Sequence, residues 1–124
     1  MIQPEILLVD DEKDILDLGV STLRDAGYTV QSAISGDIAL ILIEQGLLFD
    51  LLITDIIMPG QLDGFALAQK VREAIPDVAI VYATGYARAI NMRAQGVPDG
   101  RLLLKPWRLD ELLAVVDAAF SPQH

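Results

Sequence analysis

The sequence contains no cysteine, which excludes disulfide bonds, thiol catalysis and thiolate metal sites. Histidine is nearly absent: its one occurrence, His124, lies at the end of the chain and offers neither a metal cluster nor a catalytic base. No apolar run approaches the roughly 20 residues of a membrane span. The N-terminus also lacks a basic segment followed by an apolar one. We therefore expect a soluble, untargeted, cytoplasmic protein.

Basic residues are few as well. Nine Lys and Arg stand against 18 Asp and Glu, giving a formal net charge of -9. Such a surface repels phosphate backbones and anionic lipids, so we expect no direct binding to nucleic acid or membrane. A metal cation, or a basic or neutral protein surface, is a more suitable partner. A charge that serves only to keep the protein in solution is the alternative.

The composition is that of a folded protein. The chain has 124 residues, of which 52% are hydrophobic and 22% are charged. Its length suits one domain with a substantial core and is too short for two. No repeat, low-complexity stretch or linker interrupts it. We therefore expect residues 1–124 to form a single domain.

Short apolar runs alternate with segments of helical periodicity along the whole chain. Strands are predicted over residues 5–9, 28–33, 51–55, 78–83 and 101–104. Helices are predicted over residues 12–26, from 35 to 45, 65–74 and 109–120, with glycines at 27 and 46 ending the first two. Residues 87–100 show only one short apolar face. This alternation predicts an α/β fold in which helices cover both faces of a parallel sheet.

Polar side chains follow the predicted strands at their C-terminal ends. Asp10 and Asp11 follow the first strand, Asp55 closes the third, Thr84 follows the fourth and Lys105 follows the fifth. The carboxyl ends of parallel strands share one edge of the sheet, and ligands bind there. If the first and third strands are neighbours, the three carboxylates repel each other and raise at least one pKa unless a cation neutralises them.

These residue types suggest a particular chemistry. Carboxylates with room for water are the ligands that Mg²⁺ prefers, and Mn²⁺ is an alternative ion. A carboxylate beside such an ion can attack phosphorus and form an aspartyl phosphate. Lys105 and Thr84 could then help to neutralise and position the phosphoryl oxygens.

Each residue also has a purely structural explanation. Asp11 could cap a helix, and Asp55 could belong to an ordinary turn. Thr84 could be a turn hydroxyl, and Lys105 a solvated strand end. Independent structural causes would not place all four at strand ends in one register, which favours a common site.

Four motifs together resemble the receiver domain of two-component response regulators, in order and spacing over essentially the whole chain. They are LLVDDE (7–12), LLITDIIMPGQLDG (51–64), YATGYA (82–87) and LLLKPW (102–107). The chain is similar to receivers of hybrid sensor kinases and to stand-alone receivers. The resemblance implies a doubly wound, flavodoxin-like sheet of five strands in the order 2-1-3-4-5.

The resemblance also implies a metal site. Asp11 would bind Mg²⁺ directly and Asp10 mostly through water, while Asp55 and the carbonyl of Ile57 would complete the protein ligands.

The implied function is phosphorylation-dependent signalling. Asp55 would accept a phosphoryl group from a phosphohistidine of a sensor histidine kinase or a phosphotransfer protein. Lys105, after which a cis bond to Pro106 is expected, would pair with the phosphoryl oxygens, and Thr84 would hydrogen-bond them. Such a domain is no enzyme beyond its own phosphotransfer and slow self-dephosphorylation.

The output would be a surface change that a downstream protein reads, since the chain ends soon after the last predicted helix and leaves no output domain. A weak homodimer is a further option. One position departs from the family pattern, because Leu102 stands where receivers often carry Tyr or Phe. Tyr86 and Trp107 could substitute for that aromatic residue in switching, or could simply pack.

Two other classes of protein fit the sequence less well. A haloacid-dehalogenase-like phosphatase needs a second acid two residues after its nucleophile, but Ile57 occupies that position, and turnover of small phosphate esters would identify one. A flavodoxin-like binding module needs a Ser/Thr-rich phosphate loop after the first strand, where this chain has acids. Visible absorbance of the purified protein would reveal a flavin.

Overall fold

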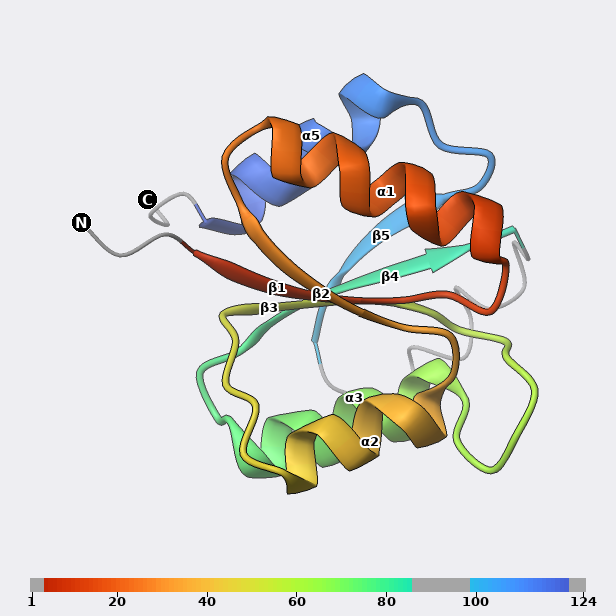
Figure 1. Cartoon of the computed structure of the whole chain (residues 1–124), viewed down its shortest axis with the longest axis vertical. Helices are drawn as coiled ribbons and strands as arrows, with labels where there is room; N and C mark the ends of the chain where they lie inside the picture. Colours follow the sequence, from red (N-terminus) through yellow and green to blue (C-terminus); the bar gives the residue numbers. More distant parts are fainter. Residues whose placement is uncertain (1–3, 86–98, 121–124) are drawn as a thin grey trace.

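The computed structural model describes residues 4–85 and 99–120 (Figure 1). The strands are β1 (Glu5–Val9), β2 (Thr29–Ala33), β3 (Leu51–Asp55), β4 (Ala79–Thr84) and β5 (Arg101–Leu104). The helices are α1 (Lys13–Asp25), α2 (Gly36–Glu44), α3 (Gly64–Ala74) and α5 (Leu109–Phe120). The predicted elements are confirmed with ends that shift by one or two residues. Most of the weakly patterned segment 87–100 lies outside the described residues.

All five strands are parallel and lie in the order β2-β1-β3-β4-β5. This confirms the doubly wound sheet and its predicted strand order. Helices α1 and α5 cover one face, and α2 and α3 cover the other (Figure 1). Within the described part of the chain, no helix combines the length and apolar character needed to cross a membrane.

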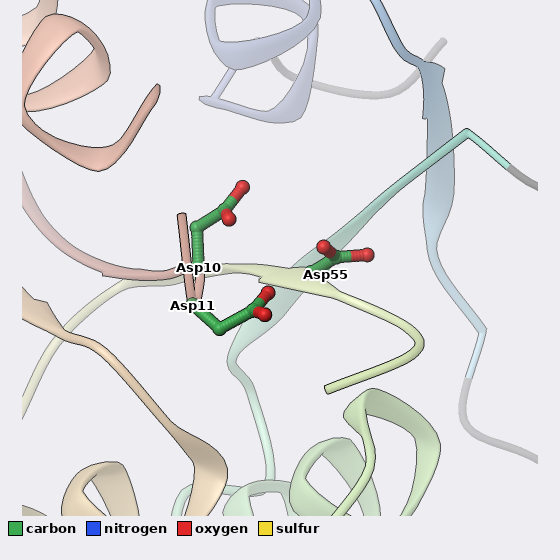
Figure 2. A group of neighbouring side chains, drawn as sticks. All are labelled: Asp10, Asp11 and Asp55. Atoms are coloured by element: carbon green, nitrogen blue, oxygen red, sulfur yellow. The ribbon is translucent and has the colours of Figure 1, made fainter. Parts of the chain in front are cut away.

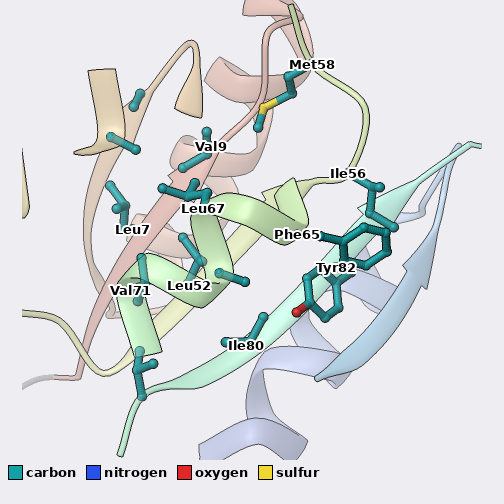
Figure 3. Close-up of a cluster of buried hydrophobic side chains, with 14 of the residues drawn as sticks. Leu7, Val9, Leu52, Ile56, Met58, Phe65, Leu67, Val71, Ile80 and Tyr82 are labelled. Atoms are coloured by element: carbon teal, nitrogen blue, oxygen red, sulfur yellow. The ribbon is translucent and has the colours of Figure 1, made fainter. Parts of the chain in front are cut away.

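The sheet separates two buried clusters because successive side chains of a strand point to opposite faces. In β1, Leu7 and Val9 join the cluster that packs with α2 and α3, whereas Ile6 and Leu8 join the one that packs with α1 and α5. Figure 3 shows the first of these clusters. Strand β3 is buried along its whole length, as its unbroken apolar sequence predicts.

The helix ends agree largely with the predicted caps. Gly27 and Gly46 follow α1 and α2 with φ of 101° and 96°, in the left-handed region that favours glycine. The cap at the start of α1, however, is Glu12 and not Asp11, and its side chain makes no capping hydrogen bond. At the fourth strand the prediction is one residue short, because Thr84 is the last residue of β4.

Helix α3 begins against the C-terminal end of β3. The Gly64 amide donates to the carbonyl oxygen of Ile56 at 2.7 Å. A Cβ at Gly64 would overlap the carbonyl oxygen of Asp55 and would lie 2.8 Å from the Ile56 Cα, so the backbones approach too closely for any side chain. This contact fixes the start of α3 against the residue that ends β3.

Replacing Gly64 by Ala should lower the free energy of unfolding by about 2–3 kcal/mol, because backbone atoms cannot move away as a flexible side chain could. Gly85→Ala is a matched control, since its Cβ would meet its nearest neighbour, the Lys105 Cβ, at an ordinary 3.8 Å. Urea unfolding measures both variants. Equal stability of the two would contradict the close approach.

Candidate functional site

Three aspartates meet at the C-terminal edge of the sheet (Figure 2). Asp10 and Asp11 follow β1, and Asp55 ends the neighbouring strand β3. Each offers a carboxylate oxygen, and these oxygens all lie within 4.8 Å of one another. The register pairs Val9 with Thr54, so the residues that follow each of them are brought side by side. The predicted acidic cluster is therefore present.

Lys105 joins this cluster from β5, on the far side of β4. Its Nζ lies 2.6 Å from Asp10 Oδ2 and 2.9 Å from Asp55 Oδ2. All three side chains are largely buried. The bond between Lys105 and Pro106 is cis, as expected. One ammonium thus bridges two buried carboxylates that come from different strands.

Thr84 and Ile57 complete the predicted set. Thr84 is fully buried at the end of β4, and its carbonyl oxygen accepts from the Lys105 amide at 2.8 Å. Ile57 lies in the loop two residues after Asp55, with 45% of its surface exposed. The proposed roles of the Thr84 hydroxyl and the Ile57 carbonyl stay predictions.

Asp10 and Asp11 have different environments despite being adjacent. Asp10 is buried; its Oδ1 accepts from the Glu12 amide at 2.9 Å while Oδ2 holds Lys105. Asp11 is exposed at the mouth of the cluster. Asp11 can therefore take a new ligand without breaking an internal ion pair, whereas Asp10 is already engaged on both oxygens.

Negative charge is in excess in the cluster. Burial raises the pKa of the Asp55 carboxyl above its ordinary value and Asp10 raises it further, although Lys105 opposes both effects. Burial alone would lower the pKa of Lys105, but the hydrogen bonds and charges of Asp10 and Asp55 outweigh burial and raise it. The two pKa shifts agree. The Lys105 ammonium stays charged, and the negative charge of the carboxylates still exceeds the positive charge in the site. A divalent cation would supply the missing positive charge.

A hollow beside the cluster was not predicted from the sequence. It has a volume of about 560 Å³ and is lined by Glu12, Ile15, Leu18, Asp55, Gly85, Lys105, Pro106 and Trp107. Its apolar wall comes from α1 and from the loop after β5. The only sequence signal was the helical spacing of Ile15 and Leu18, which equally suits a helix face packed in the core.

In β5, Leu102 occupies the position where receivers often carry Tyr or Phe. Leu102 is half-buried and lies opposite Tyr82 of β4 in the strand register. The Tyr82 ring packs against Phe65 with centroids 5.1 Å apart. Of the two predicted substitutes, Trp107 packs against the cluster beneath α1 and α5, and Tyr86 lies outside the described residues.

Comparison with known proteins agrees with this fold and this site. The family model of the response regulator receiver domain matches residues 6–117. The chain therefore belongs to the response regulator receiver domain family, whose members are signalling domains of two-component systems. Receiver domains bind Mg²⁺ at an Asp cluster and pair with histidine kinases or phosphotransfer proteins.

Relatives include both short and long proteins. Response regulator receiver protein CpdR of Brucella abortus (strain 2308) is 35% identical over 113 residues, which cover 90% of this chain and 92% of that protein. Sensor kinase CckA of the same organism is 34% identical over 122 residues, which cover 95% of this chain but only 13% of the kinase.

Solved structures show the same architecture. A response regulator receiver protein from Sinorhizobium medicae WSM419 superposes with a TM-score of 0.85 and 37% identity over 94% of each chain. Response regulator protein TrrA from Thermotoga maritima, solved in complex with Mg(2+)-BeF, superposes with a TM-score of 0.83 and 31% identity, covering 95% of this chain and 100% of that one.

Asp55→Asn should raise the free energy of unfolding at pH 7 by roughly 1 kcal/mol in EDTA, because the ionised Asp55 carboxylate is costly to bury there. A carboxyl whose pKa is raised by folding favours the folded state at low pH, and that benefit is lost as the pH rises through its folded pKa. The gain should therefore vanish below about pH 4, where the carboxyl is protonated in both states.

Urea unfolding at several pH values measures this effect. Asp25→Asn is the control, since it removes the same charge from an exposed position of α1. An Asp55→Asn variant that is no more stable than Asp25→Asn at pH 7 would show that burial of the acid carries no cost.

Proposed function

We propose that the protein accepts a phosphoryl group on Asp55 from a phosphohistidine of a histidine kinase or phosphotransfer protein, with Mg²⁺, and passes the signal on through its surface. The observation that carries this proposal is the bridging position of Lys105 Nζ between Asp10 and Asp55, within a group of three carboxylates. This arrangement combines a nucleophile, a cation and a metal-ligand set in a few ångströms.

The donor set fits the ion. Asp10, Asp11 and Asp55 offer hard oxygen ligands with an exposed side that leaves room for water, which suits Mg²⁺ better than a softer metal. We propose that the Ile57 carbonyl adds a further ligand, and that Mn²⁺ can replace Mg²⁺. When bound, the ion supplies positive charge that offsets the acids and the incoming phosphate.

The side chains then divide the work of the transfer. A carboxylate oxygen of Asp55 forms the new bond to phosphorus, while the bond from phosphorus to the donor nitrogen breaks and leaves its electron pair on that nitrogen. Lys105 exchanges its contact with Asp55 for one with a phosphoryl oxygen. We assign the Thr84 hydroxyl, from the end of β4, to a hydrogen bond with another of these oxygens.

The output follows from charge. A phosphoryl group places close to two negative charges on Asp55, which Lys105 and its neighbours must accommodate. The resulting rearrangement would change the order or position of nearby segments. A downstream protein in the cytoplasm would recognise this change. The similar TrrA protein was solved in complex with Mg(2+)-BeF, which supports the proposal of metal-dependent phosphorylation.

Incubation with acetyl phosphate and Mg²⁺ should add one phosphoryl group to the chain, detected by intact mass. The Asp55→Asn variant should gain none, because an amide is not a nucleophile toward phosphorus. Asp63→Asn is a suitable control, because that carboxylate caps α3 by accepting from the Ala66 amide at 2.8 Å and lies outside the cluster.

A phosphoryl group that persists in Asp55→Asn would place the acceptor elsewhere. Its absence from the unsubstituted protein at saturating Mg²⁺ would remove the proposed function altogether. Steady turnover of small phosphate esters would instead indicate a phosphatase.

Lys105→Met should slow phosphorylation by acetyl phosphate about 100-fold, the typical loss when one group that stabilises developing charge is removed. The same variant should need less Mg²⁺ for half of its maximal rate, because Lys105 no longer competes for the oxygens of Asp10 and Asp55. Rates followed by intact mass over a Mg²⁺ series give both quantities. An unchanged rate would show that Lys105 is only a structural ion-pair partner.

A further inference from the structure

The hollow beside Asp55 and Lys105 has two chemically different sides. Ile15 and Leu18 of α1 face Pro106 and Trp107 of the loop after β5, and together they form an apolar wall. The polar side consists of Asp55, Lys105 and Glu12. A volume of about 560 Å³ is large enough for a ring-sized organic group next to the nucleophile.

Trp107, in the apolar wall, lies beside Gly19 of α1. A Cβ added at Gly19 would lie 2.8 Å from Leu8 Cδ2 and 3.8 Å from Trp107 Cη2, so the indole lies over a helix position that has no side chain. Trp107 is only partly buried there. Leu18, on the adjoining surface of α1, is 50% exposed. An indole face and a leucine side chain are thus presented to whatever enters the hollow.

Glu12 contributes an acceptor to the rim. It occupies the N-cap position of α1 but makes no side-chain capping bond, and its side chain is 62% exposed. Its Oε1 lies 3.9 Å from Lys105 Nζ, close to but outside the tight contacts that Lys105 makes with Asp10 and Asp55. A glutamate in this position can accept a hydrogen bond from a ligand without unmaking the helix start.

We propose that this hollow receives the leaving ring of the phosphoryl donor, and that Trp107 makes the protein selective for phosphoramidates of a planar, N–H-bearing ring over acyl phosphates. In-line displacement sends the leaving group away from the attacking Asp55 oxygen, into the space that the hollow provides. This inference rests on the proposed function, because it concerns the donor used at the same site.

The step balances without any further reactant. An Asp55 oxygen bonds to phosphorus, the phosphorus–nitrogen bond breaks, and its electron pair stays on the ring nitrogen. The ring's second nitrogen keeps its proton, which donates a hydrogen bond to Glu12, so a protonated phosphoimidazole leaves as neutral imidazole. Trp107 and Leu18 contact the ring faces and edges, whereas a small acyl group such as acetyl reaches little of this wall.

The test compares N-phosphoimidazole with acetyl phosphate as donors for the full chain at saturating Mg²⁺, with rates from intact mass. Trp107→Ala should lower the rate constant for N-phosphoimidazole about tenfold, in the range of lost apolar contacts in a binding pocket. The rate constant for acetyl phosphate should change less than about twofold. Leu48→Ala, a 68% exposed residue before β3 at the opposite edge of the sheet, should change neither.

Two milder variants keep the test decisive if Trp107→Ala disturbs the fold. Leu18→Ala removes a half-exposed side chain and should lower only the N-phosphoimidazole rate. Glu12→Gln should do the same by about threefold, as expected for an exposed charge. Equal losses with both donors, or no loss with either, would overturn the selectivity. Failure of both donors with the unsubstituted protein would instead overturn the proposed function itself.

Discussion

The ammonium of Lys105, shared between the carboxylates of Asp10 and Asp55, is the interaction on which the site depends. Two buried carboxylates that end neighbouring strands would repel each other, and burial raises the pKa of the Asp55 carboxyl. Contacts of 2.6 and 2.9 Å to one cation hold both carboxylates toward the same space. With the exposed Asp11 added, negative charge still exceeds positive charge, which favours the binding of a divalent cation.

The parallel sheet brings the residues of this interaction together. Because all strands are parallel, their C-terminal ends share one edge of the sheet. Strand β4 lies between β3 and β5. Buried clusters on both faces hold the strands in register, so residues from distant parts of the sequence arrive at fixed positions. The close approach of Gly64 to the end of β3 and the packing of Trp107 over Gly19 extend that precision to the loops around the site.

Much of this arrangement could be predicted because it follows from local pattern. Apolar runs and glycine stops mark the elements, and the parallel edge then brings Asp10, Asp55 and Lys105 together. The hollow could not be predicted, because it depends on how Trp107 packs across α1, which no periodicity encodes. The structural alternative in which Asp11 caps a helix is excluded only by the structure, because α1 begins one residue later, with Glu12 at the N-cap position and no side-chain capping hydrogen bond.

Calorimetric titration with Mg²⁺ tests the central claim most directly, by comparing the unsubstituted protein with Asp11→Asn. That substitution removes a ligand from the exposed side of the cluster and leaves the ion pairs of Lys105 intact. The account predicts one ion bound per chain and a loss of binding in the variant. No measurable binding by the unsubstituted protein, or equal binding by both, would contradict it.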